Sequence, residues 1–473
     1  MIRDLARASA IFAAGSFASK FAKLLLIPLM VRYLTPDEIG MVVFLEAIML
    51  ACSRFFSLGL GQAVRRFYGE LPDAAAADAY VRVLWLASLA FAAGGLALFG
   101  ALATAVPQAF SANVPADLML LTLLAGALRS AHTIPMQRFV ARREAGRHGL
   151  LEFLELTTTV GLILALLAGA GWGLRGYLWG SVIAAGAWTA YYGLTLSAGP
   201  RGGTQWAALG PALRYSLPLW PHMLFTWAIT FVDRLVLERL VPLADVGVYG
   251  IGYQLASVIP VVTLAVTNAW LPLYFRGGGT AAGRHDFLWV LNRFCGFIAA
   301  LVLGLYLAAP EIVRLVATAG YGAAAGILQV VAIGMGFHAA YQAMILVLFY
   351  EKKGLQVSLA TGAALAVNVL GLAWLVPAFG IVGAAWATVL AFAAATAWSA
   401  VRARVRLGMS VAAVTVAIAP VLVTTAALSL LRTAAAGPLP GGRLGTAAAL
   451  AALIVTACVW SARSLPERPS AAA

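Results

Sequence analysis

Four basic side chains interrupt apolar stretches in the first third of the chain. They are Lys20, Lys23, Arg54 and Arg129. A charge at the centre of a membrane-spanning helix costs about 2.5 to 3.5 kcal/mol on insertion scales, so such residues usually face a cavity and serve a function. Because all four carry the same sign, the chemistry that suits them is the binding of an anionic group inside the membrane.

The first two apolar runs place these charges on defined helix faces. Ser16, Lys20 and Lys23 follow the spacing i, i+4, i+7, which forms one polar stripe along a helix. Glu46 and Arg54 are eight residues apart, roughly 80° around a helix that turns ~100° per residue, so we expect both to border the same cavity. Even if Glu46 pairs with one lysine, three cations are left without a carboxylate.

Polar residues in later apolar runs extend this set. Arg129 and His132 share one face of the fourth run, and Arg129 lies too deep to reach the headgroups by snorkelling. Further residues that could line the same space, or couple transport to an ion, are His222, Asp233, Arg234, Tyr253, Gln254, His338 and Gln342. Asp233 and Arg234 lie near a span end, where a structural anchor is an equally good interpretation. The hydroxyl and ring of Tyr253 would suit a sugar, but aromatic residues in membrane helices more often pack or act as interface anchors.

The elements that must position these residues are membrane-spanning helices. Of the 473 residues, 62% are hydrophobic and only 11% are charged, too few to cover a soluble globule of this size. Continuous apolar runs of about 20 residues recur along the chain, the length that spans a bilayer as a helix. We predict an all-α polytopic membrane protein with about fourteen spans: 9–31, 39–60, 81–105, 116–137, 149–170, 174–196, 213–236, 246–271, 287–309, 325–349, 355–376, 380–401, 410–431 and 444–462.

The basic residues outside these spans predict the orientation. With the N-terminus in the cytoplasm, the inner segments hold twenty Lys and Arg residues and the outer segments hold six, so both termini are predicted to be cytoplasmic. This bias accounts for most of the net charge of +14, so nucleic acid is not needed as a partner. Cys52, Cys295 and Cys458 lie singly and show no metal or redox spacing, and no cofactor is predicted.

An internal repeat organises the chain. The segment from Arg32 to Gly40 resembles the segment from Arg239 to Gly247, and Gly173 with its neighbours resembles the segment that begins at Gly380; both matches share an offset of 207 residues. We therefore predict two six-helix lobes in pseudo-two-fold repeat, residues 1–197 and 211–406, followed by two additional helices within 407–463 and a cytoplasmic tail, 464–473.

Several ordered motifs resemble those of the Wzx-type polysaccharide flippases of the MOP exporter superfamily. They are the segments 34–40, 58–67, 233–237 and 245–253. The resemblance implies an alternating-access transporter of the bacterial inner membrane. It implies that undecaprenyl-diphosphate-linked oligosaccharides pass from the cytoplasmic to the periplasmic leaflet, for O-antigen, capsule or exopolysaccharide synthesis. It also implies membrane lipids, a polysaccharide polymerase and a chain-length regulator as partners, and a lipid-tail groove formed by the last two helices.

In the related lipid II flippases, essential basic residues lie on the first two helices, where this chain has Lys20, Lys23 and Arg54. Lysine in place of the more usual arginine on the first helix implies less bidentate contact with a diphosphate. A drug or cation antiporter of the MATE type shares the fold and is the main alternative, although it should prefer acidic cavities. An O-antigen polymerase or ligase is a weaker alternative, because the sequence has no Walker A loop, no zinc spacing and no long outer loop.

Overall fold

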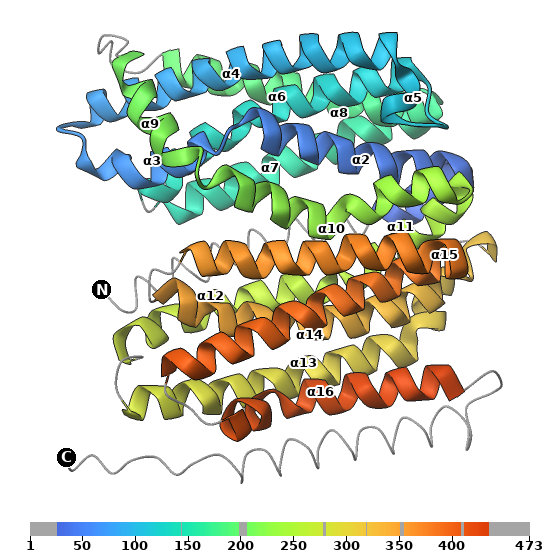
Figure 1. Ribbon diagram of the computed structural model, residues 1–473. Helices are drawn as coiled ribbons and strands as arrows, with labels where there is room; N and C mark the ends of the chain where they lie inside the picture. The colour runs from blue at the N-terminus through green and yellow to red at the C-terminus, as the bar shows by residue number, and fades with distance from the viewer. Residues whose placement is uncertain are drawn as a thin grey trace. The chain divides into compact units, whose positions relative to one another are not determined.

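The computed structural model describes residues 26–142, 144–197, 206–277, 281–317, 319–350, 354–407 and 411–434. Nearly all of these residues are helical, and no strand occurs among them (Figure 1). Lys20 and Lys23, and the predicted span 444–462, lie outside the described residues. The part of the first predicted span that is described, from Leu26, is helical as expected.

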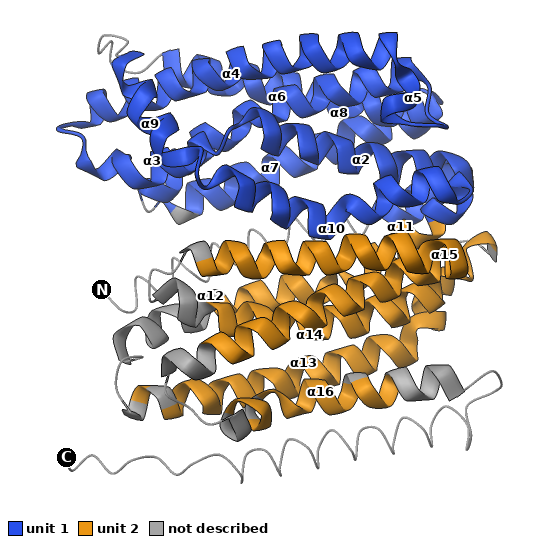
Figure 2. Ribbon diagram, in the orientation of Figure 1, with its two compact units in different colours: residues 1–247 blue, residues 248–473 orange. Residues whose placement is uncertain are grey.

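Contacts divide the chain into two compact units, residues 1–247 and 248–473 (Figure 2). The helices of the first unit are α2 (Pro36–Phe56), α3 (Leu60–Phe67), α4 (Ala74–Ala105), α5 (Pro107–Phe110), α6 (Ala116–Ala141), α7 (Ala145–Leu164), α8 (Gly173–Ser197), α9 (Leu209–Ser216) and α10 (Trp220–Leu240). Helix α11 (Leu243–Ala256) begins in this unit and ends in the next. The predicted lobe limits rest on the sequence repeat rather than on contacts, and they stay a prediction.

The second unit contains α12 (Val258–Gly277), α13 (Ala281–Val316), α14 (Ala324–Tyr350), α15 (Gly354–Leu407) and α16 (Val411–Ala434). Helix α15 is two helices joined at Gly380, whose φ of 55° lies in the left-handed region that favours glycine. The sequence predicted this break, with spans on either side of it. Within this unit α14 packs against both α13 and α15.

Eight helical segments among the described residues are long and apolar enough to cross a membrane. Together with the absence of strands from these residues, this confirms the predicted all-helical, multi-pass membrane fold. The order of the helices also follows the predicted spans, from α2 through α16.

Helix α2 begins at a local signal that the sequence carries in full. Thr35 Oγ1 accepts a hydrogen bond from the Glu38 backbone N–H (3.3 Å), and a Glu38 carboxylate oxygen accepts one from the Thr35 N–H (2.8 Å). Pro36 occupies the first helical turn, where its missing N–H costs nothing. This capping box satisfies two backbone donors that a helix end otherwise leaves unpaired.

The predicted repeat is visible in the backbone. Helix α2 starts at Pro36 and α11 at Leu243, which is 207 residues later, and the Ala244 N–H donates to the Asp37 carboxylate (3.0 Å). The two helix starts approach so closely that a Cβ on Gly40 would lie 1.9 Å from the Leu243 carbonyl oxygen. A Cβ on Gly247, the equivalent residue, would lie 2.7 Å from the Pro36 oxygen. The contact is thus reciprocal between equivalent residues.

Candidate functional site

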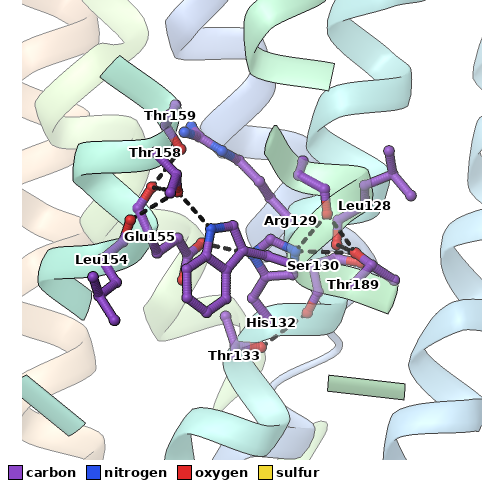
Figure 3. Close-up of polar contacts among 12 residues, drawn as sticks. Leu128, Arg129, Ser130, His132, Thr133, Leu154, Glu155, Thr158, Thr159 and Thr189 are labelled. Atoms are coloured by element: carbon purple, nitrogen blue, oxygen red, sulfur yellow. Dashed lines mark hydrogen bonds and ion pairs between the residues drawn. The ribbon is translucent and has the colours of Figure 1, made fainter. Parts of the chain in front are cut away.

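A buried polar cluster joins α6, α7 and α8 around His132 (Figure 3). His132 Nδ1 lies 2.6 Å from a Glu155 carboxylate oxygen on α7. On the opposite side of the ring, Nε2 lies 3.0 Å from the Ala185 carbonyl oxygen and 3.0 Å from Thr189 Oγ1, both on α8. The side chain of His132 is 6% exposed and that of Glu155 is 24% exposed. Only the carboxylate end of the pair is therefore open to its surroundings.

Close packing of α2 on α6 positions Arg129 beside this cluster. A Cβ on Gly126 would lie 2.7 Å from Cys52 Cβ and 2.8 Å from the Met49 carbonyl oxygen, so only glycine permits this approach. Met49 is thereby placed so that its sulfur lies 3.3 Å from Arg129 Nη1. The charge of Arg129 also acts electrostatically on the Glu155 carboxylate. Arg129 and His132 do lie together, as the sequence predicted.

Arg54 and Arg129 resemble each other in the state of their charged groups. Across the part of the chain that the structure describes, neither guanidinium has a carboxylate within the 4.0 Å of an ion pair. Arg54 is exposed near the end of α2, and its backbone carbonyl accepts hydrogen bonds from Trp220 Nε1 at 3.2 Å and from Ser57 Oγ at 3.1 Å. Both guanidinium groups can therefore accept an anion without first breaking an ion pair.

Three arginines near helix ends are paired with carboxylates. Arg142 lies 2.9 Å and Arg138 3.6 Å from the Asp78 carboxylate, and Arg175 lies 3.0 Å from Asp117. Arg142 also donates to the hydroxyl of Tyr68, a residue outside the membrane spans whose pKa is raised by partial burial. These pairs serve the ends of the helices rather than the cluster.

Glu46 is held by a hydrogen bond that the sequence did not predict. Tyr177 on α8 donates its hydroxyl to the Glu46 carboxylate at 2.5 Å. Glu46 is half-buried on α2, and Arg129 acts electrostatically on Tyr177. The first unit thus holds two carboxylates, Glu46 and Glu155, that each have a hydrogen-bonding partner on a neighbouring helix.

Glu155, Tyr177 and Thr189 are absent from the residues predicted as functional. The sequence does carry a signal for Glu155, because a carboxylate within an apolar run is as unusual as the four basic residues. Thr189 and Tyr177 carry no such signal, since hydroxyl-bearing residues are common in membrane helices. Their roles depend on which helices are neighbours.

On α10, Asp233 and Arg234 are buried, at 2% and 5% exposure, and their side chains pair with each other at 2.7 Å. Arg234 also lies over the Phe231 ring, 4.9 Å from its centroid. His222 is half-buried earlier on the same helix. The pairing of Asp233 with Arg234 fits the structural anchor that the sequence left open, and a role in binding or coupling stays a prediction.

The predicted residues of the second unit lie on two helices, α11 and α14. Tyr253 is buried and Gln254 half-buried on α11, and Gln342 is half-buried on α14. The His338 ring packs edge-on against Phe392 of α15, with centroids 4.7 Å apart. Their participation in one substrate cavity stays a prediction. Within the described ranges, no group of three or more His, Cys, Asp or Glu residues could hold a metal ion.

Comparison with solved structures identifies the fold. The chain is similar to a structure described as the lipid II flippase MurJ in an inward closed conformation, at 13% identity and a TM-score of 0.72, over 95% of this chain and 97% of that chain. It is similar to an inward-facing multidrug resistance MATE family transporter of the MOP superfamily, at 14% identity and a TM-score of 0.64, over 85% and 94% of the two chains. The chain shares the fold of these two structures.

A third similar structure is a MOP superfamily transporter from Pyrococcus furiosus Vc1, at 14% identity and a TM-score of 0.59, over 86% of this chain and 97% of that chain. Its binding pocket is described as having reverse polarity that suggests a different function. No curated protein matches the sequence significantly. A family profile described as "Polysaccharide biosynthesis protein" matches residues 29–325. The chain belongs to this family of polysaccharide biosynthesis proteins, which confirms the predicted resemblance, and its fold is that of transporters and flippases.

Proposed function

We propose that this protein flips undecaprenyl-diphosphate-linked oligosaccharides from the cytoplasmic to the periplasmic leaflet. The observation that carries the proposal is the pair of guanidinium groups, on Arg54 and Arg129, that have no ion pair among the described residues. Membership of the polysaccharide biosynthesis family supports a glycan as cargo, and the flippase fold supports a lipid-linked one.

The physical task of such a flippase is to replace lost hydration. A diphosphate headgroup cannot cross hydrocarbon unaided, because removing its charges from water costs many kcal/mol. Arginine suits this task, since its planar guanidinium donates two parallel hydrogen bonds to phosphate oxygens. The lipid tail stays in the bilayer throughout, so no bond has to be made or broken and the protein acts as a transporter rather than an enzyme.

The polymerase or ligase alternative would need reacting groups that the described site does not assemble, since its carboxylates are engaged by His132 and Tyr177. Export of cationic drugs by a MATE-type antiporter is the nearer alternative. Glu46 and Glu155 are the carboxylates that a cation would use in the described cluster, yet each already accepts a hydrogen bond or shares a proton with a neighbour. Arg54 and Arg129 are not so engaged. The available charge is therefore positive, which favours an anionic substrate.

The setting of the proposed function is the bacterial inner membrane, with both termini in the cytoplasm, where the basic segments would face anionic lipid headgroups. Lys20 and Lys23 are proposed to extend the anion site along the first helix. A polysaccharide polymerase and a chain-length regulator would receive the flipped unit on the far side.

The test uses charge variants of both arginines. Arg54→Glu and Arg129→Glu should abolish translocation, whereas the Gln variants should retain part of it, because repulsion of the diphosphate in a low-dielectric cavity adds several kcal/mol, on the order of 4 for charges 4 Å apart. The matched control is Arg175→Gln, which removes a 70% exposed, carboxylate-paired arginine of the same unit and should leave translocation unchanged. Leaflet-resolved accessibility of an undecaprenyl-diphosphate glycan in vesicles measures the outcome.

Dye efflux from the same cells distinguishes the alternative. A cation exporter should tolerate or gain from added carboxylates, so its efflux would survive in the Glu variants. Unchanged glycolipid translocation in Arg54→Glu and Arg129→Glu, or dye efflux without any glycolipid movement, would transfer the protein to the antiporter class.

A further inference from the structure

The hydrogen bonds of His132 fix where its protons must lie. A carbonyl oxygen can only accept, so the Ala185 oxygen, 3.0 Å from Nε2, requires a proton on that nitrogen. Nδ1 lies 2.6 Å from Glu155 Oε1, and neither a bare imidazole nitrogen nor an ionised carboxylate oxygen can donate. A second proton must therefore be shared between these two atoms. The pair holds it either as imidazolium with carboxylate or as neutral imidazole with carboxylic acid.

Loss of this shared proton would break the contact. Two lone pairs would then face each other at 2.6 Å, and the Glu155 carboxylate would be left with a full charge and no donor on His132. Because 24% of the Glu155 side chain is exposed, the carboxylate is open to its surroundings, whereas His132 is enclosed between α6 and α8. The proton therefore enters and leaves through Glu155.

Arg129 connects this proton to anion binding. It lies on the same helix as His132, three residues earlier, and its charge already acts on Glu155. While the pair is protonated, the guanidinium has no carboxylate within ion-pair distance among the described residues. Once the proton leaves, Glu155 carries a full negative charge that acts on the arginine. An ionised Glu155 and an anionic ligand then compete for one guanidinium.

We propose that His132 and Glu155 form a proton-binding site whose occupancy controls the affinity of Arg129 for an anionic ligand. The inference rests on the proposed function, because it takes Arg129 as part of the diphosphate site. Linkage requires the effect to be reciprocal: a bound anion promotes uptake of a proton by the pair, and the proton promotes anion binding by the same factor.

Other charged or titratable groups near the pair do not replace either partner. Tyr192 of α8 lies beside the imidazole, with ring centroids 5.7 Å apart, and a phenol keeps its proton across the neutral range. On α2, Glu46 is engaged by Tyr177. On α4, Asp78 is engaged by Arg138 and Arg142, and on α3, Arg65 donates to Gln137.

The experiment measures binding of a short-chain prenyl-diphospho-N-acetylglucosamine to the full-length protein in lipid nanodiscs, from about pH 5.5 to about pH 9. This probe is a diphosphate diester whose own charge is constant over that range. Wild-type affinity should fall by up to about tenfold per pH unit above the pH at which the pair loses its proton, the slope for one linked proton. Calorimetry in two buffers of different ionisation enthalpy should show uptake of about one proton on binding there.

Glu155→Gln should remove both the pH dependence of binding and the proton uptake, and it should retain high affinity at all pH values. The reason is that the glutamine amide can donate to His132 Nδ1, which preserves the hydrogen bond of the protonated pair. The matched control is Glu152→Gln, one turn earlier on α7, which alters a second glutamate beside a histidine, His148, at 3.8 Å. It should keep the wild-type profile. His132→Gln also removes the titratable pair and serves if Glu155→Gln is not folded by size exclusion and thermal melting.

The outcomes separate the two proposals. Binding that is lost in Arg129→Gln but has the same pH dependence in wild type and Glu155→Gln overturns the proton site and leaves the anion site standing. Binding by the wild type that does not change with pH would likewise overturn the proton site and leave the anion site standing. Failure of the wild type to bind the probe, or binding unchanged by Arg129→Gln, overturns the anion site and the proton linkage together.

Discussion

The contact between α2 and α6 offers a direct test of how the anion site is built. Gly126 lies one turn before Arg129, and a Cβ added there would lie 2.7 Å from Cys52 Cβ and 2.8 Å from the Met49 oxygen. Carbon atoms pack best about 3.5 to 4.0 Å apart, so Gly126→Ala requires α2 to move away by roughly 1 Å. That movement carries Met49 away from its 3.3 Å contact with Arg129.

The magnitude follows from a comparison with a second glycine. Gly161→Ala on α7 places its methyl group in open space, so it should gain up to about 1 kcal/mol from helix propensity. Gly126→Ala gains the same propensity term but overfills a packed contact, which typically costs about 1–3 kcal/mol. We therefore expect Gly126→Ala to be less stable than Gly161→Ala by about 1–3 kcal/mol.

Thermal or denaturant unfolding in one detergent measures this difference, and the vesicle assay measures translocation by both variants. Gly126→Ala should translocate poorly even at temperatures where it stays folded, because Arg129 loses its support, whereas Gly161→Ala should behave as wild type. Equal stability of the two variants would show that α2 and α6 do not pack at this distance. Full translocation by a destabilised Gly126→Ala would show that Arg129 does not need this contact.

Three further outcomes are expected. Gly380→Ala should lose about 1–2 kcal/mol of stability, because alanine is strained in the left-handed conformation of this residue. Nothing lies within 4 Å of the added Cβ, so no clash contributes to the loss. A variant as stable as wild type in thermal melts would contradict the φ angle of Gly380. Glu238→Ala should lose about 3 kcal/mol or more in the same melts, since this fully buried carboxylate accepts hydrogen bonds from Ser111 and Asn113; a change below ~1 kcal/mol would refute its structural role. Reporter fusions placed at four positions should all report cytoplasm: after Arg66, Arg147, Lys353 and Arg406. A periplasmic signal at two of these sites would refute the predicted topology.

Much of the fold could be predicted because membrane helices are specified locally. Apolar length alone located α6 and α8 closely, and the capping residues Thr35 and Glu38 mark the start of α2. The break at Gly380 was also predictable, since the repeat aligns it with Gly173, which begins α8 with the same φ of 55°.

The partners of the site residues could not be predicted in the same way. The depth of Arg129 follows from its position in an apolar run, but its neighbours depend on how α2, α6, α7 and α8 pack. The sequence predicted a role for Glu46 but not for Glu155, which lies on α7 and pairs with His132 of α6. Pairing across helices is a tertiary property, and a single sequence carries no direct signal of it.

The matching conformations of Gly173 and Gly380 bear on how the chain arose. Both residues begin a helix with φ 55°, and they lie 207 residues apart, as expected if one ancestral half was duplicated and kept its backbone turns. The chemistry did not stay duplicated. At the positions 207 residues after Glu46, Arg129, His132 and Glu155, the chain has Tyr253, Gly336, Ala339 and Gly362. The two copies therefore kept one architecture while their side chains diverged, and the ionisable cluster belongs to the first copy alone.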